Sequence, residues 1–139
     1  MIVALDSEAV YALAGPASSS AHRRVRRALT TAARLGRPVV VPTVVLAELY
    51  RGPKRSQQID ALLARRQYAI ACRDTDRRLA RFVGAVLQAS GAGSEDIVDA
   101  HVVAVVAEAG GGLLLTGDLS DLSRLAAPYH RVIVEPLEG

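Results

Sequence analysis

The stretch SEDIVDAHVVAVVAEAGGGLLLTGDLSDLSRLA, residues 94–126, decides the fold class of this chain. Its first half is mostly apolar up to three consecutive glycines, so we expect a helix over about Glu95–Ala109 with Ser94 as its N-terminal cap. The apolar run Leu113–Thr116 then predicts a buried strand, and the glycine and aspartate after it predict a turn. A second helix is expected over Ser120–Ala126. A helix, a buried strand and another helix in this order are typical of an α/β fold.

The remainder of the chain repeats this alternation of short apolar runs and helical periodicity. The other expected strands lie at residues 1–6, 39–41, 68–72 and 131–135, and the other expected helices at 7–14, 18–35, 43–51, 56–66 and 74–90. Thr43 follows a proline and is the expected N-terminal cap of its helix. Strands that are almost entirely apolar indicate a sheet covered on both faces. The sequence therefore predicts one α/β domain over residues 1–139, a three-layer sandwich around a mostly parallel five-stranded sheet.

Composition narrows the class of protein. The chain has 139 residues, of which 50% are hydrophobic and 22% charged, so it suits one folded domain and excludes a disordered chain. No apolar run approaches the roughly 18 residues of a membrane span, and the start MIVALD lacks the basic residues of a signal peptide. The single cysteine, Cys72, excludes a disulfide framework and a cysteine-rich zinc site, and we expect it to be buried at the end of its strand. These features favour a cytoplasmic protein.

The basic residues are concentrated in two places. Arginine accounts for all but one of the 17 basic residues, and the net charge is +3. One group lies in the second expected helix and includes Arg23 and Arg27, and the other comprises Arg51, Lys54 and Arg55. The planar guanidinium suits phosphate, so both groups are candidates for nucleic-acid contact. A solvent-exposed helix face is the alternative for each group.

Five of the acidic residues occupy positions that favour a metal site. Asp6 closes the first expected strand and Asp118 follows the fourth, and the carboxyl ends of parallel strands meet at one edge of a sheet. Glu48 lies in an otherwise apolar helical segment, and Asp96 and Asp99 are about one helical turn apart. Carboxylates brought together repel one another, and a divalent cation relieves that repulsion. Oxygen ligands without cysteine favour Mg²⁺ or Mn²⁺ over zinc.

Each of these acids also has a local explanation. Asp6 and Asp118 could cap the helices that follow them, and Asp96 could interact with the dipole of its helix. Glu48 could lie on a solvated helix face beside a basic residue. Asp99 lies too far into its helix for capping, and the chain offers no lysine cluster to neutralise the five acids. The set taken together therefore favours a metal site.

Four segments carry a resemblance to a known family. They are the strand end Val3–Ser7, the segment Ala47–Gly52 with the sequence AELYRG, and the stretches Ser94–Gly111 and Leu113–Ala126. In this order and spacing the chain resembles the PIN domain, and within that family the VapC toxins of bacterial toxin–antitoxin pairs, especially those of actinobacteria. The resemblance covers essentially the whole chain and implies a PIN-like α/β fold.

The resemblance also implies a set of site residues. The catalytic acids would be Asp6, Glu48, Asp99 and Asp118, and the metal ligands would be Asp6, Glu48, Asp96, Asp99 and Asp118. The supporting hydroxyls would be those of Ser7 and Thr116. Asp121 is a weaker second match in the loop of Asp118. The three glycines before the fourth strand depart from the family pattern and could shift that loop.

The function implied by the resemblance is that of a metal-dependent endoribonuclease. Carboxylate-held Mg²⁺ or Mn²⁺ would supply a nucleophilic water and absorb the negative charge of the RNA phosphodiester. The implied partners are RNA, a cognate VapB-like antitoxin and a second copy of the chain in a homodimer. Arg23, Arg27, Arg51, Lys54 and Arg55 would then be candidates for RNA contact. The alternative is a catalytically weak PIN module that acts mainly in an antitoxin complex repressing its own operon.

Other chemistries fit the sequence less well. A phosphotransferase of the haloacid dehalogenase type needs Asp-x-Asp after its first strand, where this chain has Asp6, Ser7 and Glu8. A receiver domain needs paired acids there and a lysine after its last strand. Neither a P-loop nor a dinucleotide-binding glycine motif occurs, and the sequence contains no nucleophile elbow. His101 follows Asp99 on its helix, and we interpret it as a packing or surface residue.

Overall fold

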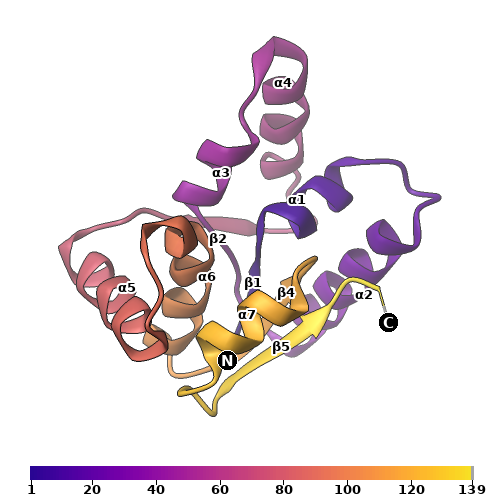
Figure 1. Ribbon diagram of the computed structural model, residues 1–139. Helices are drawn as coiled ribbons and strands as arrows, with labels where there is room; N and C mark the ends of the chain where they lie inside the picture. Colours follow the sequence, from indigo (N-terminus) through magenta and orange to yellow (C-terminus); the bar gives the residue numbers. More distant parts are fainter. Residues whose placement is uncertain (139) are drawn as a thin grey trace.

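A five-stranded sheet lies between two layers of helices in the computed structural model, which describes residues 1–138 (Figure 1). The strand order is β3-β2-β1-β4-β5, and every neighbouring pair is parallel. The strands are β1 (Ile2–Leu5), β2 (Val39–Pro42), β3 (Ile70–Arg73), β4 (Gly112–Thr116) and β5 (Val132–Pro136). The predicted α/β sandwich is confirmed, and its sheet is wholly parallel.

Helices cover both faces of this sheet. They are α1 (Ser7–Ala14), α2 (Ser20–Leu35), α3 (Thr43–Leu49), α4 (Gly52–Leu63), α5 (Arg77–Ser90), α6 (Ile97–Glu108) and α7 (Leu119–Ala126), and a 3-10 turn, η1 (Ser94–Asp96), precedes α6. Figure 1 shows α1 and α2 on one side of the sheet, α5 and α6 on the other, and α3 and α4 projecting beyond the strands. Helix α7 packs against α5, α6 and β5. Within residues 1–138, no helix is both long and apolar enough to cross a bilayer.

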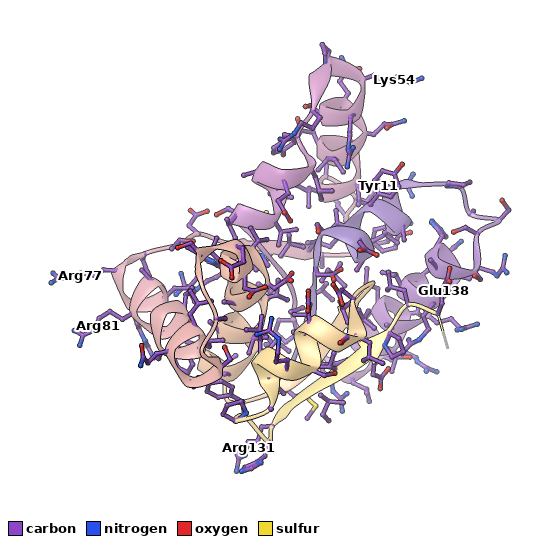
Figure 2. All side chains as sticks on the ribbon, viewed as in Figure 1. Tyr11, Lys54, Arg77, Arg81, Arg131 and Glu138 are labelled. Carbon is purple, nitrogen blue, oxygen red and sulfur yellow. The ribbon has the colours of Figure 1, made fainter. Side chains whose placement is uncertain are left out.

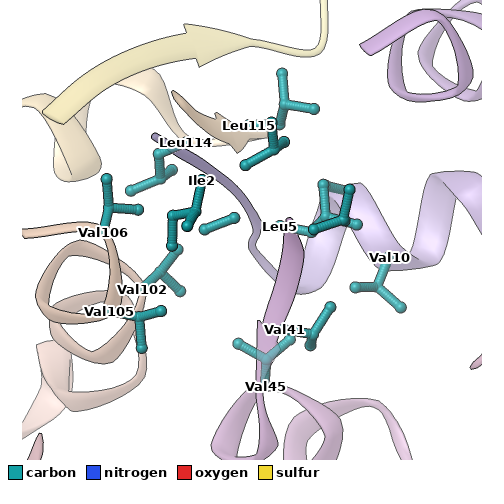
Figure 3. Close-up of a cluster of buried hydrophobic side chains, with 14 of the residues drawn as sticks. Ile2, Leu5, Val10, Val41, Val45, Val102, Val105, Val106, Leu114 and Leu115 are labelled. Carbon is teal, nitrogen blue, oxygen red and sulfur yellow. The ribbon is translucent and has the colours of Figure 1, made fainter. Parts of the chain in front are cut away.

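The core is built around β1 and α6. All four residues of β1 are buried because the central strands are covered on both faces. Helix α6 is buried nearly all round, from Ala100 to Val106. In Figure 3 the side chains of Val102 and Val106 lie close to Ile2 and Leu114 of the sheet. A helix without a polar face is typical of a core position, and α6 therefore holds the acids of its first turn in a fixed place relative to the central strands.

The predicted cap of α3 and the predicted start of α4 both differ from the structure. Helix α3 begins at Thr43, but its cap position is Pro42, and the Thr43 hydroxyl instead donates to the Arg73 carbonyl at 3.5 Å. Helix α4 begins at Gly52 rather than at the predicted residue 56. Pro53 explains the earlier start, because proline is well suited to the first turn of a helix.

The start of α6 also differs from the prediction. Ser94 does not cap this helix, because residues 94–96 form the 3-10 turn η1 and α6 begins at Ile97. Asp96 occupies the cap position, but its side chain forms no capping hydrogen bond. The Asp96 carboxylate is therefore free to face other side chains.

The prediction that Cys72 is buried was wrong. Strand β3 is an edge strand of the sheet, and Ala71 and Cys72 are both exposed. Desolvation and the charge of Asp74 still raise the pKa of the Cys72 thiol. An apolar run reads the same at the edge of a sheet as at its centre, so the pattern alone could not show this exposure.

The three glycines before β4 make a tight connection. Residues 110–112 have φ angles of +90°, +122° and +157°, which residues with a side chain disfavour. A Cβ at Gly112 would lie 2.1 Å from the Ile2 carbonyl oxygen. Backbone approach this close allows β4 to enter the sheet directly beside β1, with Leu115 opposite Leu5. The glycines therefore leave the register of β4 against β1 unbroken.

Candidate metal centre

Asp6 ties the end of β1 to the turn that follows β4. Its Oδ1 accepts a hydrogen bond from the Ala9 backbone N–H at 2.8 Å and so caps α1. Its Oδ2 accepts another from the Gly117 backbone N–H at 3.2 Å, and the Thr116 hydroxyl also bonds the carboxylate. Because β1 and β4 are parallel neighbours, both loops emerge at the same edge of the sheet. Asp6 is held between them and is only 4% exposed.

Asp118 organises the turn itself. Its backbone N–H donates to Thr116 Oγ1 at 2.8 Å, and its Oδ1 accepts from the Asp121 backbone N–H at 3.1 Å, capping α7. The local capping roles considered for Asp6 and Asp118 are thus both realised. These caps fix the two carboxylates at the carboxyl edge of the sheet, so capping and membership of a common site are compatible.

Three carboxylates from the starts of α6 and α7 also come together. Asp96, Asp99 and Asp121 each place one oxygen within 4.8 Å of the other two. Arg124, one turn after Asp121, has its Nη2 3.2 Å from Asp96 Oδ2 and 3.8 Å from Asp121 Oδ1. The arginine therefore offsets part of the negative charge of this cluster.

The pKa of Asp99 links this cluster to the other acids. Burial raises it most, and the charges of Asp6, Asp118, Glu48 and Asp121 raise it further, to about 6. Like charges disfavour the ionised form of a carboxyl group when they are close and poorly solvated. The charges that act on Asp99 therefore come from four other segments: the end of β1, α3, the turn after β4, and α7.

The same environment raises the pKa values of neighbouring acids. Burial raises the pKa of Asp6, although hydrogen bonds from a hydroxyl and from backbone N–H groups act in the opposite direction. Burial and the charges of Asp6 and Asp118 raise the pKa of Glu8. A hydrogen bond with Asp118, followed by the charge of that residue, raises the pKa of Asp121. Negative charge thus accumulates at this edge, which suits it to a cation.

Comparison with known proteins connects this geometry to a family. The sequence matches the PIN domain over residues 3–128. The chain belongs to the PIN domain family. Its fold is similar to that of a chain in the VapBC2 complex from Rickettsia felis, solved bound to a DNA fragment from the promoter, with a TM-score of 0.64, 19% sequence identity and 98% of each chain covered. No curated protein matches the sequence.

In this PIN domain the structure brings most of the predicted acids together. Asp6 and Asp118 lie at the carboxyl edge of the sheet, and Asp96 lies beside Asp99. Glu48 is exposed on α3, and its charge contributes to the raised pKa of Asp99. It does not belong to the closely spaced cluster, whose third member is Asp121.

Thr116, Ser7 and His101, the polar residues near the predicted acids, differ in their burial and hydrogen bonds. Thr116 is fully buried and bonds both Asp6 and Asp118. Ser7 is the half-buried first residue of α1, and its hydroxyl has no hydrogen-bond partner within residues 1–138. His101 is buried, with Nδ1 2.7 Å from the Ile97 carbonyl oxygen, which agrees with a packing role.

Two residues at the centre were absent from the predicted set. Glu8 lies over the turn after β4, since a Cβ on Gly117 would be 1.6 Å from its Oε2. The signal for Glu8 was its place in the first turn of α1, the helix that Asp6 caps. Arg124 gave no such signal, because its contact with Asp96 depends on how α7 packs beside α6.

The residues predicted to contact nucleic acid flank helix α1. Arg23 and Arg27 are exposed on α2, and Arg51, Lys54 and Arg55 lie at the start of α4. Helices α2 and α4 both pack against α1. Positive charge therefore lies to either side of α1 in this PIN domain.

The donor set fits a hard divalent cation. The side chains that converge on Asp99 are all carboxylates, and the one cysteine lies on the edge strand β3. Ligand oxygens about 2.1 Å from a Mg²⁺ ion lie up to about 4.2 Å apart, close to the spacing of the three-residue cluster. Asp96, Asp99 and Asp121 could therefore hold one such ion.

Proposed function

We propose that this PIN domain is the VapC-type toxin of a type II toxin–antitoxin pair and a metal-dependent endoribonuclease. The proposed catalytic acids are Asp6, Glu48, Asp99 and Asp118, with Asp96 as a further metal ligand and Ser7 and Thr116 as supporting hydroxyls. The observation that carries the proposal is the geometry of the acids: Asp96, Asp99 and Asp121 each place one oxygen within 4.8 Å of the other two, and Asp6 and Asp118 hold the turn after β4. We add Asp121 to the proposed ligands because it completes the closely spaced cluster.

The chemistry requires a bound Mg²⁺ or Mn²⁺, which activates water and neutralises charge that develops on the phosphate. The chain's own contribution is a preformed set of oxygen donors. Hydrogen bonds from the Ala9 and Gly117 backbone N–H groups fix Asp6, and Thr116 and Asp118 hold the adjacent turn. Asp99 is poised to take up a proton near neutral pH in the absence of metal, since its pKa is about 6.

The proposed partners follow from the motifs and from the comparison structure. The motifs resemble those of VapC toxins, and the similar fold in Rickettsia felis was solved as a VapBC2 complex on promoter DNA. We therefore propose a VapB-like antitoxin as inhibitor, a homodimer as the basic unit and RNA as substrate, in the cytoplasm. The second candidate is a catalytically weak module acting mainly in an antitoxin complex that represses its own operon. The DNA-bound state of the comparison complex favours that candidate.

The test is cleavage of RNA by the purified protein with and without metal. Cleavage with Mg²⁺ or Mn²⁺ should stop on addition of EDTA. Asp6→Asn and Asp99→Asn should each reduce the cleavage rate at least about a hundredfold, with an unchanged circular dichroism spectrum. Asp74→Asn is the matched control, because Asp74 is exposed on the loop after β3. Cleavage that survives both site substitutions would refute the mechanism, and promoter binding by the antitoxin complex without any cleavage would support the second candidate.

A further inference from the structure

A basic groove lies between the end of α1 and the start of α4. It has a volume of about 510 Å³. Its lining includes Tyr11, Arg51, Lys54, Arg55 and Gln58, together with apolar residues and glycines, and no acidic residue. Lys54 and Arg55 form no salt bridge within residues 1–138. The groove is therefore complementary to an anion.

Tyr11 gives this groove a flat aromatic surface. The Arg55 guanidinium lies over the ring, with its carbon 4.9 Å from the ring centroid. Tyr11 is nevertheless 59% exposed, so most of the side chain is open to solvent. The Arg55 Nε is buried without a hydrogen-bond partner among the described residues, and the ring contact holds this guanidinium in place. The pair thus forms a platform ordered before any ligand binds.

The groove shares Tyr11 with a second cavity, which lies beside the turn after β4. This cavity, of about 580 Å³, is lined by Glu8, Tyr11, Thr116 and Gly117 among others. Glu8 and Tyr11 are three residues apart on α1 and share a face of the helix. Tyr11 therefore stands between the acids and the basic residues, on α1 beside α4 in Figure 2, which also shows Lys54 at the outer part of α4.

We propose that this groove holds the single-stranded segment of RNA next to the cleaved bond, with one base stacked on Tyr11. The proposal rests on the proposed endoribonuclease function. Backbone phosphates would contact Arg51 and Lys54. The Arg51 guanidinium is already oriented, because its Nη1 donates to the carbonyls of Ala47 and Tyr50 at 2.8 and 2.7 Å.

The groove favours single-stranded RNA over other occupants. A base can stack on a protein ring only when it is free of its own helical stack, so a duplex would leave Tyr11 without a partner. An acidic peptide would pair with the cations but would gain little from the exposed ring of Tyr11. Alternating phosphates and bases match a surface that alternates cations and an aromatic ring.

The experiment measures binding of a fluorescein-labelled 12-nucleotide oligouridine by anisotropy, in EDTA so that the RNA stays intact. Tyr11→Ala should weaken binding about tenfold, and Tyr11→Phe should stay within about twofold of the parent protein. Arg81→Ala is the control. Arg81 lines a separate cavity with Arg77, Phe82 and Tyr129, and Figure 2 shows Arg77 and Arg81 on the opposite side of the molecule from Tyr11 and Lys54. Its loss should change affinity by less than about twofold. Melting temperatures confirm that each variant is folded.

Other outcomes would overturn the proposal. Equal affinity of Tyr11→Ala and the parent protein would remove the stacking site, and so would an equal loss in Tyr11→Ala and Tyr11→Phe. A Tyr11→Ala variant that loses only binding to a co-purified antitoxin would assign the groove to a protein partner and overturn RNA stacking. The proposed function fails separately, if the parent protein neither binds nor cleaves RNA. Metal-dependent cleavage with an unchanged Tyr11→Ala affinity would leave that function standing and reject the groove.

Discussion

Replacing Asp99 by asparagine should stabilise the metal-free protein at neutral pH. Burial and neighbouring carboxylates raise the pKa of Asp99 from 3.8 to about 6. The folded protein therefore binds the Asp99 proton more tightly than the unfolded chain does. Stability falls as pH rises from about 4 to about 6, and the full penalty is present above pH 6. Asparagine removes the charge, and Asp99 accepts no hydrogen bond within residues 1–138 that the amide would lose.

The size of this effect follows from the pKa. A pKa raised from 3.8 to about 6 corresponds to about 3 kcal/mol at pH 7.5, since each unit is worth about 1.4 kcal/mol. Asp99 is only partly buried, and solvent screening reduces the expected gain to about 1–2 kcal/mol. For a domain of this size the melting temperature should then rise by about 4–8 °C.

The assay is thermal unfolding in EDTA at pH 7.5 and at pH 4.5. The gain from Asp99→Asn should be present at pH 7.5 and should shrink to about a third at pH 4.5, where the native carboxyl is already protonated. Mn²⁺ without EDTA should raise the melting temperature of the parent protein and not that of the variant. Asp74→Asn, at an exposed loop position, should change little at either pH. An Asp99→Asn variant that is no more stable than the parent at pH 7.5 would refute the convergence of charge on Asp99.

Two further predictions concern Arg124 and the glycines. Arg124→Ala should change the free energy of unfolding in EDTA by less than about 1 kcal/mol, because the side chain is 45% exposed. The same substitution should tighten Mn²⁺ binding about threefold in isothermal titration calorimetry, because it removes a competing cation. Weaker Mn²⁺ binding would contradict this. Gly112→Ala should destabilise the fold by at least about 3 kcal/mol in urea unfolding, since its Cβ would lie 2.1 Å from the Ile2 carbonyl oxygen. Gly84→Ala, in α5 with open space around it, should instead stabilise by about 0.5–1 kcal/mol, and equal effects of the two substitutions would contradict the steric account.

The sequence was sufficient to predict an element where residues close together in the chain determine its bounds. Helix α1 has its predicted bounds because Asp6 caps its start and Gly15 with Pro16 ends it. The order of the strands in the sheet does not depend on neighbouring residues in this way. The run that contains Cys72 is apolar, yet it forms the edge of the sheet, because strand order depends on how helices far apart in the chain pack together.

The candidate site shows the same division. Asp6 and Asp99 could be placed from the sequence, since a strand end and a helix turn both have a fixed direction. The sequence could not decide in the same way whether Glu48 or Asp121 lies closer to the other acids of the candidate metal site. Glu48 is carried by α3, which projects beyond the strands, whereas Asp121 is brought to Asp96 and Asp99 by the packing of α7 on α6.

The bond between the Gly117 N–H and Asp6 Oδ2 joins residues 111 positions apart. Asp6 is therefore synthesised well before β4 and the turn that follows it. A chain still attached to the ribosome before β4 emerges would hold Asp6 and Glu48 without Asp118 and Asp121. Parallel pairing between such distant strands is also slow to form. The acidic centre would therefore assemble only after β4 has been synthesised, which leaves an interval in which the proposed antitoxin can already be present when the site forms.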